Sequence, residues 1–331
     1  MKFSIFFSLL NIAFVVLAHP EPEPELSATE VVKRELEARN REWKTRNCQA
    51  EIRAFTANRM AKRETKLEGR QAPSGTEFTA AAHVTGIPDS ATCIVAPEVT
   101  EGPYYINNEL VRQNLTETQG GTVIVLDIGV ININTCQPIS DAFVELWAGI
   151  TTNYSFCYLI IHGLLANATG IYGGYSGATN AVKKETFGRG GYPTDSAGIV
   201  EMTTIYPGYY FGRTAHIHTM IHLNYTKNTD GTIKSSSGSM VHSGQFFFDE
   251  TWNDKVYANS PYTLNKQPRT RNAQDGFIKE AQGNGYNSFA SLGYLSGSSL
   301  STGLLGYITV GVDPKADYAI GNQNFYGGTG L

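Results

Sequence analysis

Short apolar runs, several of them alternating with polar residues, follow one another along the chain from residue 121 onward. Runs of this kind, separated by glycine-rich and polar turns, are typical of β-strands. Their length and spacing predict a mainly β protein built as a β-sandwich. A stretch rich in Asn, Ser, Gly and Gln, 261–300, is predicted to be surface loop. The predicted strands span residues 121–133, 142–147, 198–205, 215–223, 244–249 and 306–312.

The N-terminal part follows a different pattern. Residues 21–66 are charged and contain few β-branched side chains, which predicts a short charged helical leader outside the core. An apolar run from Phe3 to Leu17, followed by Ala18, is typical of a secretory signal peptide. The pairs Lys33-Arg34 and Lys62-Arg63 leave processing of the leader open. We therefore divide the chain into a signal peptide (1–18), a helical leader or propeptide with its linker (19–75) and a β-sandwich domain (76–331).

Composition restricts the expected cellular location of the protein and its expected binding partners. With 26 basic and 30 acidic residues the charge is nearly balanced, so we expect no nucleic-acid partner. We expect a secreted, extracellular protein with no membrane anchor after signal cleavage, and both a monomer and a homodimer stay open. In a secreted protein four cysteines are disulfide candidates with three pairings: Cys48, Cys93, Cys136 and Cys157. Four triplets are candidate glycan acceptors: Asn114, Asn153, Asn167 and Asn224.

The candidate chemistry lies in the predicted strand 215–223. His216 and His218 are separated by one residue, so on a strand both side chains project from the same face and can reach one ion. His222 has the same parity, but at about 3.3 Å per residue it lies roughly 13 Å from His218, and we interpret it as structural. A His-X-His triplet alone is a weak metal signal, because any strand that exposes two histidines has the same pattern.

Two tyrosines strengthen that signal. Tyr210 precedes His216 by six residues, and Tyr172 ends the segment Asn-Ala-Thr-Gly-Ile-Tyr. A phenol binds metal once it is ionised, and because its ordinary pKa is about 10 this requires a strongly polarising ion. Oxygen donors beside imidazoles suit ferric iron better than zinc.

Six segments in this order carry a family resemblance: Thr100–Tyr105, Trp147, Asn167–Tyr172, Tyr206–Tyr210, Arg213–His218 and Gly244–Asp249. Together they resemble the intradiol ring-cleavage dioxygenases, in particular a secreted fungal type. They are also similar to the catalytic domains of protocatechuate 3,4-dioxygenase and catechol 1,2-dioxygenase. The likeness covers roughly residues 93–312.

The resemblance implies a reaction and a role for each matching residue. A catechol-type substrate and O2 react with intradiol cleavage, both oxygen atoms enter the product, and the product is a cis,cis-muconate. Tyr210 is implied to leave the metal and take a substrate proton, Arg213 to stabilise negative charge on the ring, and Gln245 to lie near the substrate pocket. The implied ligands of a non-haem iron(III), Fe(III), are Tyr172, Tyr210, His216 and His218.

Alternatives stay open at several positions. Tyr175 competes with Tyr172 and Tyr209 with Tyr210, while Arg213 could be a surface cation. Three aromatic residues are predicted to form pocket wall, turn or core: Tyr104, Tyr105 and Trp147.

A different function is a non-catalytic secreted β-sandwich that binds aromatic or carbohydrate ligands. A zinc or copper hydrolase is a third reading, although the sequence contains no HExxH motif. The sequence does not specify which catechol is the substrate.

One segment departs from the family pattern. Residues 149–165 separate Trp147 from Asn167, where the family has only two residues between these segments. The segment is strongly apolar, which is unusual for an exposed connection. A retained intron and a genuine lid or loop are the two explanations, and sequencing the cDNA distinguishes them.

Overall fold

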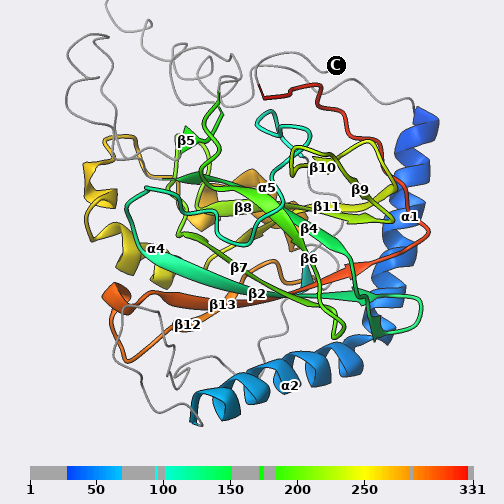
Figure 1. Ribbon diagram of the computed structural model, residues 1–331, viewed down its shortest axis with the longest axis horizontal. Coiled ribbons are helices and arrows are strands. Elements are labelled where there is room, and N and C mark those ends of the chain that lie inside the picture. The colour runs from blue at the N-terminus through cyan, green and yellow to red at the C-terminus, as the bar shows by residue number, and fades with distance from the viewer. Residues whose placement is uncertain are drawn as a thin grey trace, which may run out of the picture.

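A computed structural model describes residues 28–68, 94–95, 101–150, 171–174, 184–282 and 286–326. Within these ranges two main sheets pack as a sandwich, as Figure 1 shows, and the predicted mainly β fold is confirmed. Two helices precede the strands, α1 (Ala28–Asn47) and α2 (Gln49–Glu68). The predicted signal peptide, the 75/76 boundary, residues 151–165 of the extra segment and Tyr175 lie outside the described residues.

The first sheet has six strands, in the order β1-β13-β2-β3, with β12 paired to β13 and β7 paired to β2. β13 runs parallel to β1 and β2, whereas β2 pairs antiparallel with β7. The strands are β1 (Ile94–Val95), β2 (Val123–Asn132), β3 (Gln137–Pro138), β7 (Ile199–Ile205), β12 (Ser291–Tyr294) and β13 (Leu304–Val312).

The second sheet has five strands, in the order β11-β8-β4-β5, with β6 paired to β4, and all of these pairings are antiparallel. A two-stranded sheet of β9 (Thr226–Lys227) and β10 (Ile233–Lys234) stands apart from both. The five strands are β4 (Phe143–Ile150), β5 (Ile171–Tyr172), β6 (Arg189–Pro193), β8 (His216–Leu223) and β11 (Ser239–Phe247).

The main core lies between the two sheets. Alternate residues of β2, such as Leu126 and Ile128, and the β8 residues Ile217 and Ile221 are buried in this core. Removing each such side chain from water contributes roughly 1.5–3 kcal/mol. Because side chains alternate along a strand, the histidines of β8 project from the opposite face of the five-stranded sheet.

The helical leader packs against the domain. Cys48 and Ile52 are buried together with Ile131 of β2, and Arg59 of α2 pairs with Asp127 of β2. Figure 1 shows α2 lying along the six-stranded sheet. The predicted helical leader is confirmed, and its residues lie outside the main core. They pack in a separate cluster against the six-stranded sheet, a contact that the sequence did not predict. No helix among the described residues is long and apolar enough to cross a membrane.

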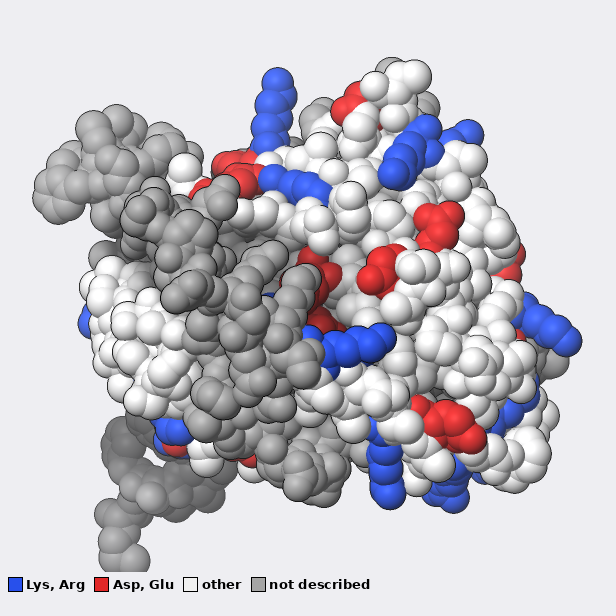
Figure 2. Space-filling view, turned by 60° about the horizontal axis from the view of Figure 1, so that its bottom comes forward, with Lys and Arg blue, Asp and Glu red and all other residues white. Residues whose placement is uncertain are grey.

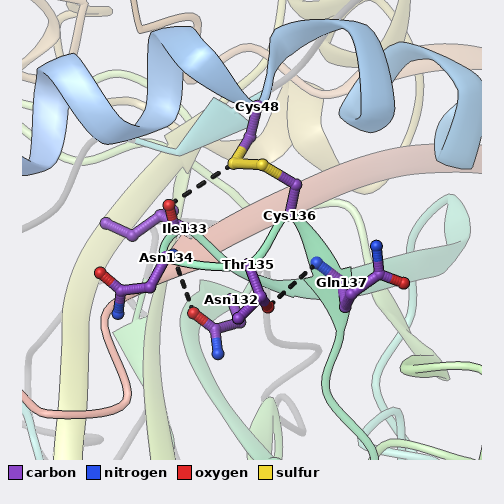
Figure 3. The surroundings of a disulfide bond; sticks show 7 residues. All are labelled: Cys48, Asn132, Ile133, Asn134, Thr135, Cys136 and Gln137. Atoms are coloured by element: carbon purple, nitrogen blue, oxygen red, sulfur yellow. Dashed lines mark hydrogen bonds between the residues drawn. A yellow bond between two sulfur atoms is a disulfide. The ribbon is translucent and has the colours of Figure 1, made fainter.

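A disulfide bond fixes the same contact. Cys48, between α1 and α2, is joined to Cys136 in the turn after β2, across a sequence separation of 88 (Figure 3). This is one of the bonds that the sequence allowed, and Cys93 and Cys157 lie outside the described residues. Closing so long a loop stabilises the fold by restricting the unfolded chain.

The prediction of a surface loop at 261–300 was wrong. This stretch contains α5 (Gly276–Ala281) and β12, besides 3-10 turns, and it follows α4 (Glu250–Tyr257). Its polar side chains are buried where they bind the backbone or other side chains: Asn265 donates to the carbonyl of Tyr209, and Asp275 accepts from Arg213. Some of the polar residues therefore form buried hydrogen bonds, while others, such as Lys266 and Gln274, are exposed. On the face shown in Figure 2, charges of both signs are interspersed.

Candidate metal centre

β8 places His216 and His218 side by side. Both are buried, and their ring centroids are 5.1 Å apart. Nδ1 of His216 lies 2.7 Å from the carbonyl oxygen of Thr214. Because a carbonyl only accepts, Nδ1 carries the proton and Nε2 presents a lone pair, which is the form that binds metal. His222 on the same strand bonds to Glu145 at 2.8 Å, which agrees with its predicted structural role.

Tyr172 comes to the same point from β5. Its hydroxyl lies 2.9 Å from Nε2 of His216, and since Nδ1 holds the imidazole proton, the phenol is the donor. This contact brings two atoms that could bind one ion to within hydrogen-bond distance of each other.

Tyr210 approaches from the loop after β7. The backbone N–H of Arg213 donates to its carbonyl at 3.0 Å, which closes a tight turn. The Tyr210 ring centroid lies 5.7 Å from that of His216 and 6.2 Å from that of Tyr172. Tyr209 packs instead in the main core, with its ring centroid 4.8 Å from that of Tyr257. Of the two adjacent tyrosines, Tyr210 is the one beside the histidines.

The structure thus brings the four predicted ligand residues into one cluster, and their role as ligands stays a prediction. Burial raises the pKa of Tyr172 and of Tyr210, and the positive charge of Arg213 opposes the shift at both phenols. A bound cation would replace the two protons.

The donor set itself fits a hard, oxidised ion. Within the part of the chain that the structure describes, no group of three or more His, Cys, Asp or Glu side chains is placed to hold a metal. Among the described residues, the phenols of Tyr172 and Tyr210 are the further donors beside His216 and His218. Two imidazoles and two phenolates suit ferric iron better than zinc, and this set speaks against the hydrolase reading.

A buried cation lies next to the cluster. Arg213 donates through Nη2 to Gln245 Oε1 and through Nε to Asp275 Oδ2 at 3.0 Å, and its guanidinium carbon lies 4.3 Å from the ring centroid of Phe277. Arg213 is only 2% exposed, so the alternative of a surface cation was wrong. Gln245 is also buried and pairs with His218 across the β8–β11 ladder.

Sequence reasoning missed Asp275. Its carboxylate accepts from Arg213, from the N–H of Thr214 at 2.9 Å and, through the other oxygen, from the N–H of Phe277 at 3.0 Å. The last contact caps the start of α5. An Asp-Gly pair before a helical pattern was the available signal, but it predicts a helix cap and carries no sign of a contact with Arg213.

Aromatic side chains surround the cluster. Tyr104 stacks on Tyr172 with ring centroids 4.7 Å apart, and Trp147 stacks on His218 at 5.0 Å. Tyr105 is buried and bonds to Ser235 at 3.1 Å. Tyr104 and Tyr210 are partly exposed, whereas Tyr172, His216 and His218 are buried. These placements agree with the predicted wall and core roles.

Comparison with known proteins shows which structures this chain resembles. No protein-family model matches the sequence, and no curated protein matches it. An intradiol ring-cleavage dioxygenase from Tetranychus urticae matches in structure with 29% identity and a TM-score of 0.53, over 67% of this chain and 96% of that one. A second dioxygenase crystal structure gives 29% identity and 0.53, over 68% and 97%. The chain is therefore similar in structure to intradiol ring-cleavage dioxygenases.

Proposed function

We propose that this chain is a non-haem iron(III) intradiol dioxygenase that cleaves a catechol-type ring with O2. One observation carries the proposal: in a fold similar to intradiol dioxygenases, two phenols and two imidazoles converge in one cluster beside a buried arginine. His216, His218, Tyr172 and Tyr210 would hold the ion. Bound Fe(III) would act as a Lewis acid toward both oxygens of the catechol.

The chain's own residues then have separate tasks. With the ion bound, the phenolate of Tyr210 would be the base that takes a proton from the entering substrate. Arg213 places a fixed positive charge where negative charge develops on the ring, and Gln245 and Asp275 hold its guanidinium in place. Because these groups are buried, their electrostatic effect is stronger than in water, and no reorganisation is needed during the reaction.

The direct test uses purified full-length protein, iron analysis, a visible spectrum and oxygen uptake with catechol, hydroxyquinol and protocatechuate. We expect ferric iron, a tyrosinate-to-iron absorption band and oxygen uptake with at least one of the three. A colourless, iron-free protein that binds aromatic or carbohydrate ligands would support the non-catalytic alternative. Bound zinc or copper without oxygen uptake would support a hydrolase.

Two variants separate holding the metal from activating the substrate. His216→Ala is expected to lose most of its iron. Tyr210→Phe is expected to keep iron but to lower kcat by roughly 10²–10⁴, because it removes a general base. Tyr209→Phe is the matched control, since that ring packs in the main core. Parent rates in both site variants would show that the site has been misplaced.

The proposal includes secretion, as in the fungal type that the sequence resembles. The signal-peptide pattern of residues 1–18 motivates it. The bond between Cys48 and Cys136 supports it, because structural disulfides persist in oxidising compartments. Protein recovered from culture medium should begin near His19, and retention in the cytosol would contradict secretion without touching the metal centre.

A further inference from the structure

Arg189 lies next to the candidate metal centre but outside the proposed ligand set. It is fully buried on β6, and its guanidinium donates in three directions. Nε donates to the carbonyl of Gly173, Nη2 to the carbonyl of Tyr104, and Nη1 to Glu109 Oε1 at 3.0 Å. The guanidinium carbon is 5.9 Å from the ring centroid of Tyr172.

The two carbonyls belong to the segments that carry Tyr172 and Tyr104. Tyr172 stands on β5, a strand of only two residues that pairs with β4, and Gly173 follows it directly. Tyr104 lies in a stretch without regular structure and stacks on Tyr172. Within the described residues β5 forms two register pairs with β4, and Arg189 adds bonds to the carbonyls of Gly173 and Tyr104, which restrain both rings.

Space around Gly173 is tight as well. A Cβ added to Gly173 would lie 2.3 Å from the carbonyl oxygen of Phe187, which directly precedes the Gly188-Arg189 pair. The backbone that follows Tyr172 is therefore packed against the backbone that leads into Arg189. A shift of the guanidinium would be transmitted to Tyr172 with little slack.

Glu109 balances the buried charge. Its side chain is fully buried, and its second oxygen accepts from the hydroxyl of Tyr326 at 2.9 Å. Tyr326 belongs to the C-terminal segment, which is bound to the same region through the N–H of Asn107 and the carbonyl of Asn324 at 2.8 Å. The carboxylate is therefore held from both sides, and it in turn fixes the orientation of Arg189.

We propose that Arg189, held by Glu109 and Tyr326, is a positioning residue that orients Tyr172 and its stacking partner Tyr104 at the metal centre. This inference rests on the proposed function, because it assigns Tyr172 to the metal. The planar fork of arginine meets all three acceptors at once, whereas the ammonium of lysine keeps the charge without that geometry.

The test compares Arg189→Lys with Arg59→Lys in the full-length, iron-loaded protein. Arg59 is a matched control, because it is also buried, is also paired with a carboxylate and also donates to a backbone carbonyl, but on the other sheet. The readouts are the tyrosinate-to-iron band and the rate of iron release to a chelator. Arg189→Lys is expected to shift the band and to speed iron release about 10- to 100-fold, whereas Arg59→Lys keeps the parent values.

The outcomes separate the inference from the proposed function. A parent protein without ferric iron or the band removes both. If the parent has ferric iron and the band, and Arg189→Lys keeps the parent band and iron-release rate, the inference alone is overturned. A change in Arg59→Lys as large as that in Arg189→Lys also overturns it. If Arg189→Lys does not fold, Glu109→Gln takes its place, with Tyr326→Phe as the milder variant. Faster iron release in these two supports the inference, and parent values in Glu109→Gln overturn it.

Discussion

A buried arginine–carboxylate pair is present on each sheet of the sandwich. Arg59 of α2 pairs with Asp127 at 2.7 Å on the six-stranded sheet, and Arg189 pairs with Glu109 at 3.0 Å beside the five-stranded sheet. Burial raises the pKa of both carboxyl groups, that of Glu109 to about 7, while the paired arginine opposes the shift. The same chemistry therefore operates at both places.

The acceptors around the two arginines differ in how else they are held. Besides Asp127, Arg59 donates to the carbonyl of Ile308 and to the hydroxyl of Thr309. These acceptors belong to β2 and β13, which pair along nine residues, so they stay in place without it. Among the described residues, the acceptors of Arg189 lie on Gly173, Tyr104 and Glu109, none of which belongs to a long ladder such as that of β2 and β13. A buried arginine thus adds stability in the first case and sets the position of side chains in the second.

The largest expected effect removes the first arginine. Arg59→Ala leaves the buried Asp127 with only the more distant guanidinium of Arg63, 3.8 Å away, as counter-charge, and we expect the free energy of unfolding to fall by about 3 kcal/mol. Because β2 and β13 hold each other, the tyrosinate-to-iron band of the folded variant should match the parent. Urea unfolding at neutral pH and a visible spectrum measure the two quantities. A stability loss below about 1 kcal/mol would show that the pair is not desolvated in solution.

Low pH should lower the free energy of unfolding through the five-stranded sheet, which carries the candidate metal centre. All four histidines that the structure describes lie on β8 and β11, and burial lowers the pKa of His242 from 6.5 to about 3. The unfolded chain takes up the proton first, so stability falls as pH falls from about 6.5 to about 3, by roughly 1.4 kcal/mol per pH unit. By about pH 5 the loss is about 2 kcal/mol.

His242→Phe isolates this contribution, because neither ring nitrogen of His242 has a hydrogen-bond partner among the described residues. The variant should lose less stability than the parent between about pH 6.5 and about pH 5, and unfolding curves across that range measure the difference. Parallel curves for parent and variant would mean that His242 is hydrated or paired in solution.

Sequence periodicity predicted the long strands, because each has one face in the main core. The start of β11 was missed, since a register shift between Met240 and His242 breaks the alternation. β6, with the sequence Arg-Gly-Gly-Tyr-Pro, has no apolar pattern at all and is held by pairing with β4. Local pattern predicts a strand where the core imposes it and not where pairing alone does.

The same limit applies to the site. The shared face of His216 and His218 follows from the period of a strand, and a family resemblance selected the tyrosines. Asp275 and Glu109 meet their arginines across 62 and 80 positions of sequence, and no local pattern encodes such contacts. The residues that hold the site in shape are therefore the part that only the fold reveals.

Substitution of two glycines, one near each sheet, tests the same difference between the sheets with a smaller expected effect. A Cβ on Gly129 would lie 2.4 Å from Phe55 Cε1, so Gly129→Ala should push α2 away at a cost of about 1–3 kcal/mol and leave the site unchanged. A Cβ on Gly102 would lie 3.2 Å from His218 Cε1, at a φ of +70°. Gly102→Ala should cost about 1–2 kcal/mol and also speed iron release. Equal rates of iron release in the two variants would contradict the view that contacts on the six-stranded sheet affect stability alone while those beside the five-stranded sheet also affect the site.

The smallest effect is expected at the exposed end of the α2 contact, where Arg63 pairs with Glu201, a side chain that is 53% exposed. Glu201→Gln should change stability by no more than about 1 kcal/mol, because solvent screens such a pair, and added salt should shrink the difference further. A larger loss of stability would show that the Arg63–Glu201 pair contributes as much as the buried arginine–carboxylate pairs.

The weak hold at Arg63 also bears on processing, since the Lys62-Arg63 pair is a candidate cleavage site. The pair lies in the second half of α2, whereas the bond between Cys48 and Cys136 joins the segment before it to the domain. Cleavage after Arg63 should therefore leave the fragment that contains Cys48 attached to the domain on a non-reducing gel and release it after reduction, whether or not Lys33-Arg34 is also cut. Release of the fragment that contains Cys48 without a reductant would show that the disulfide does not form.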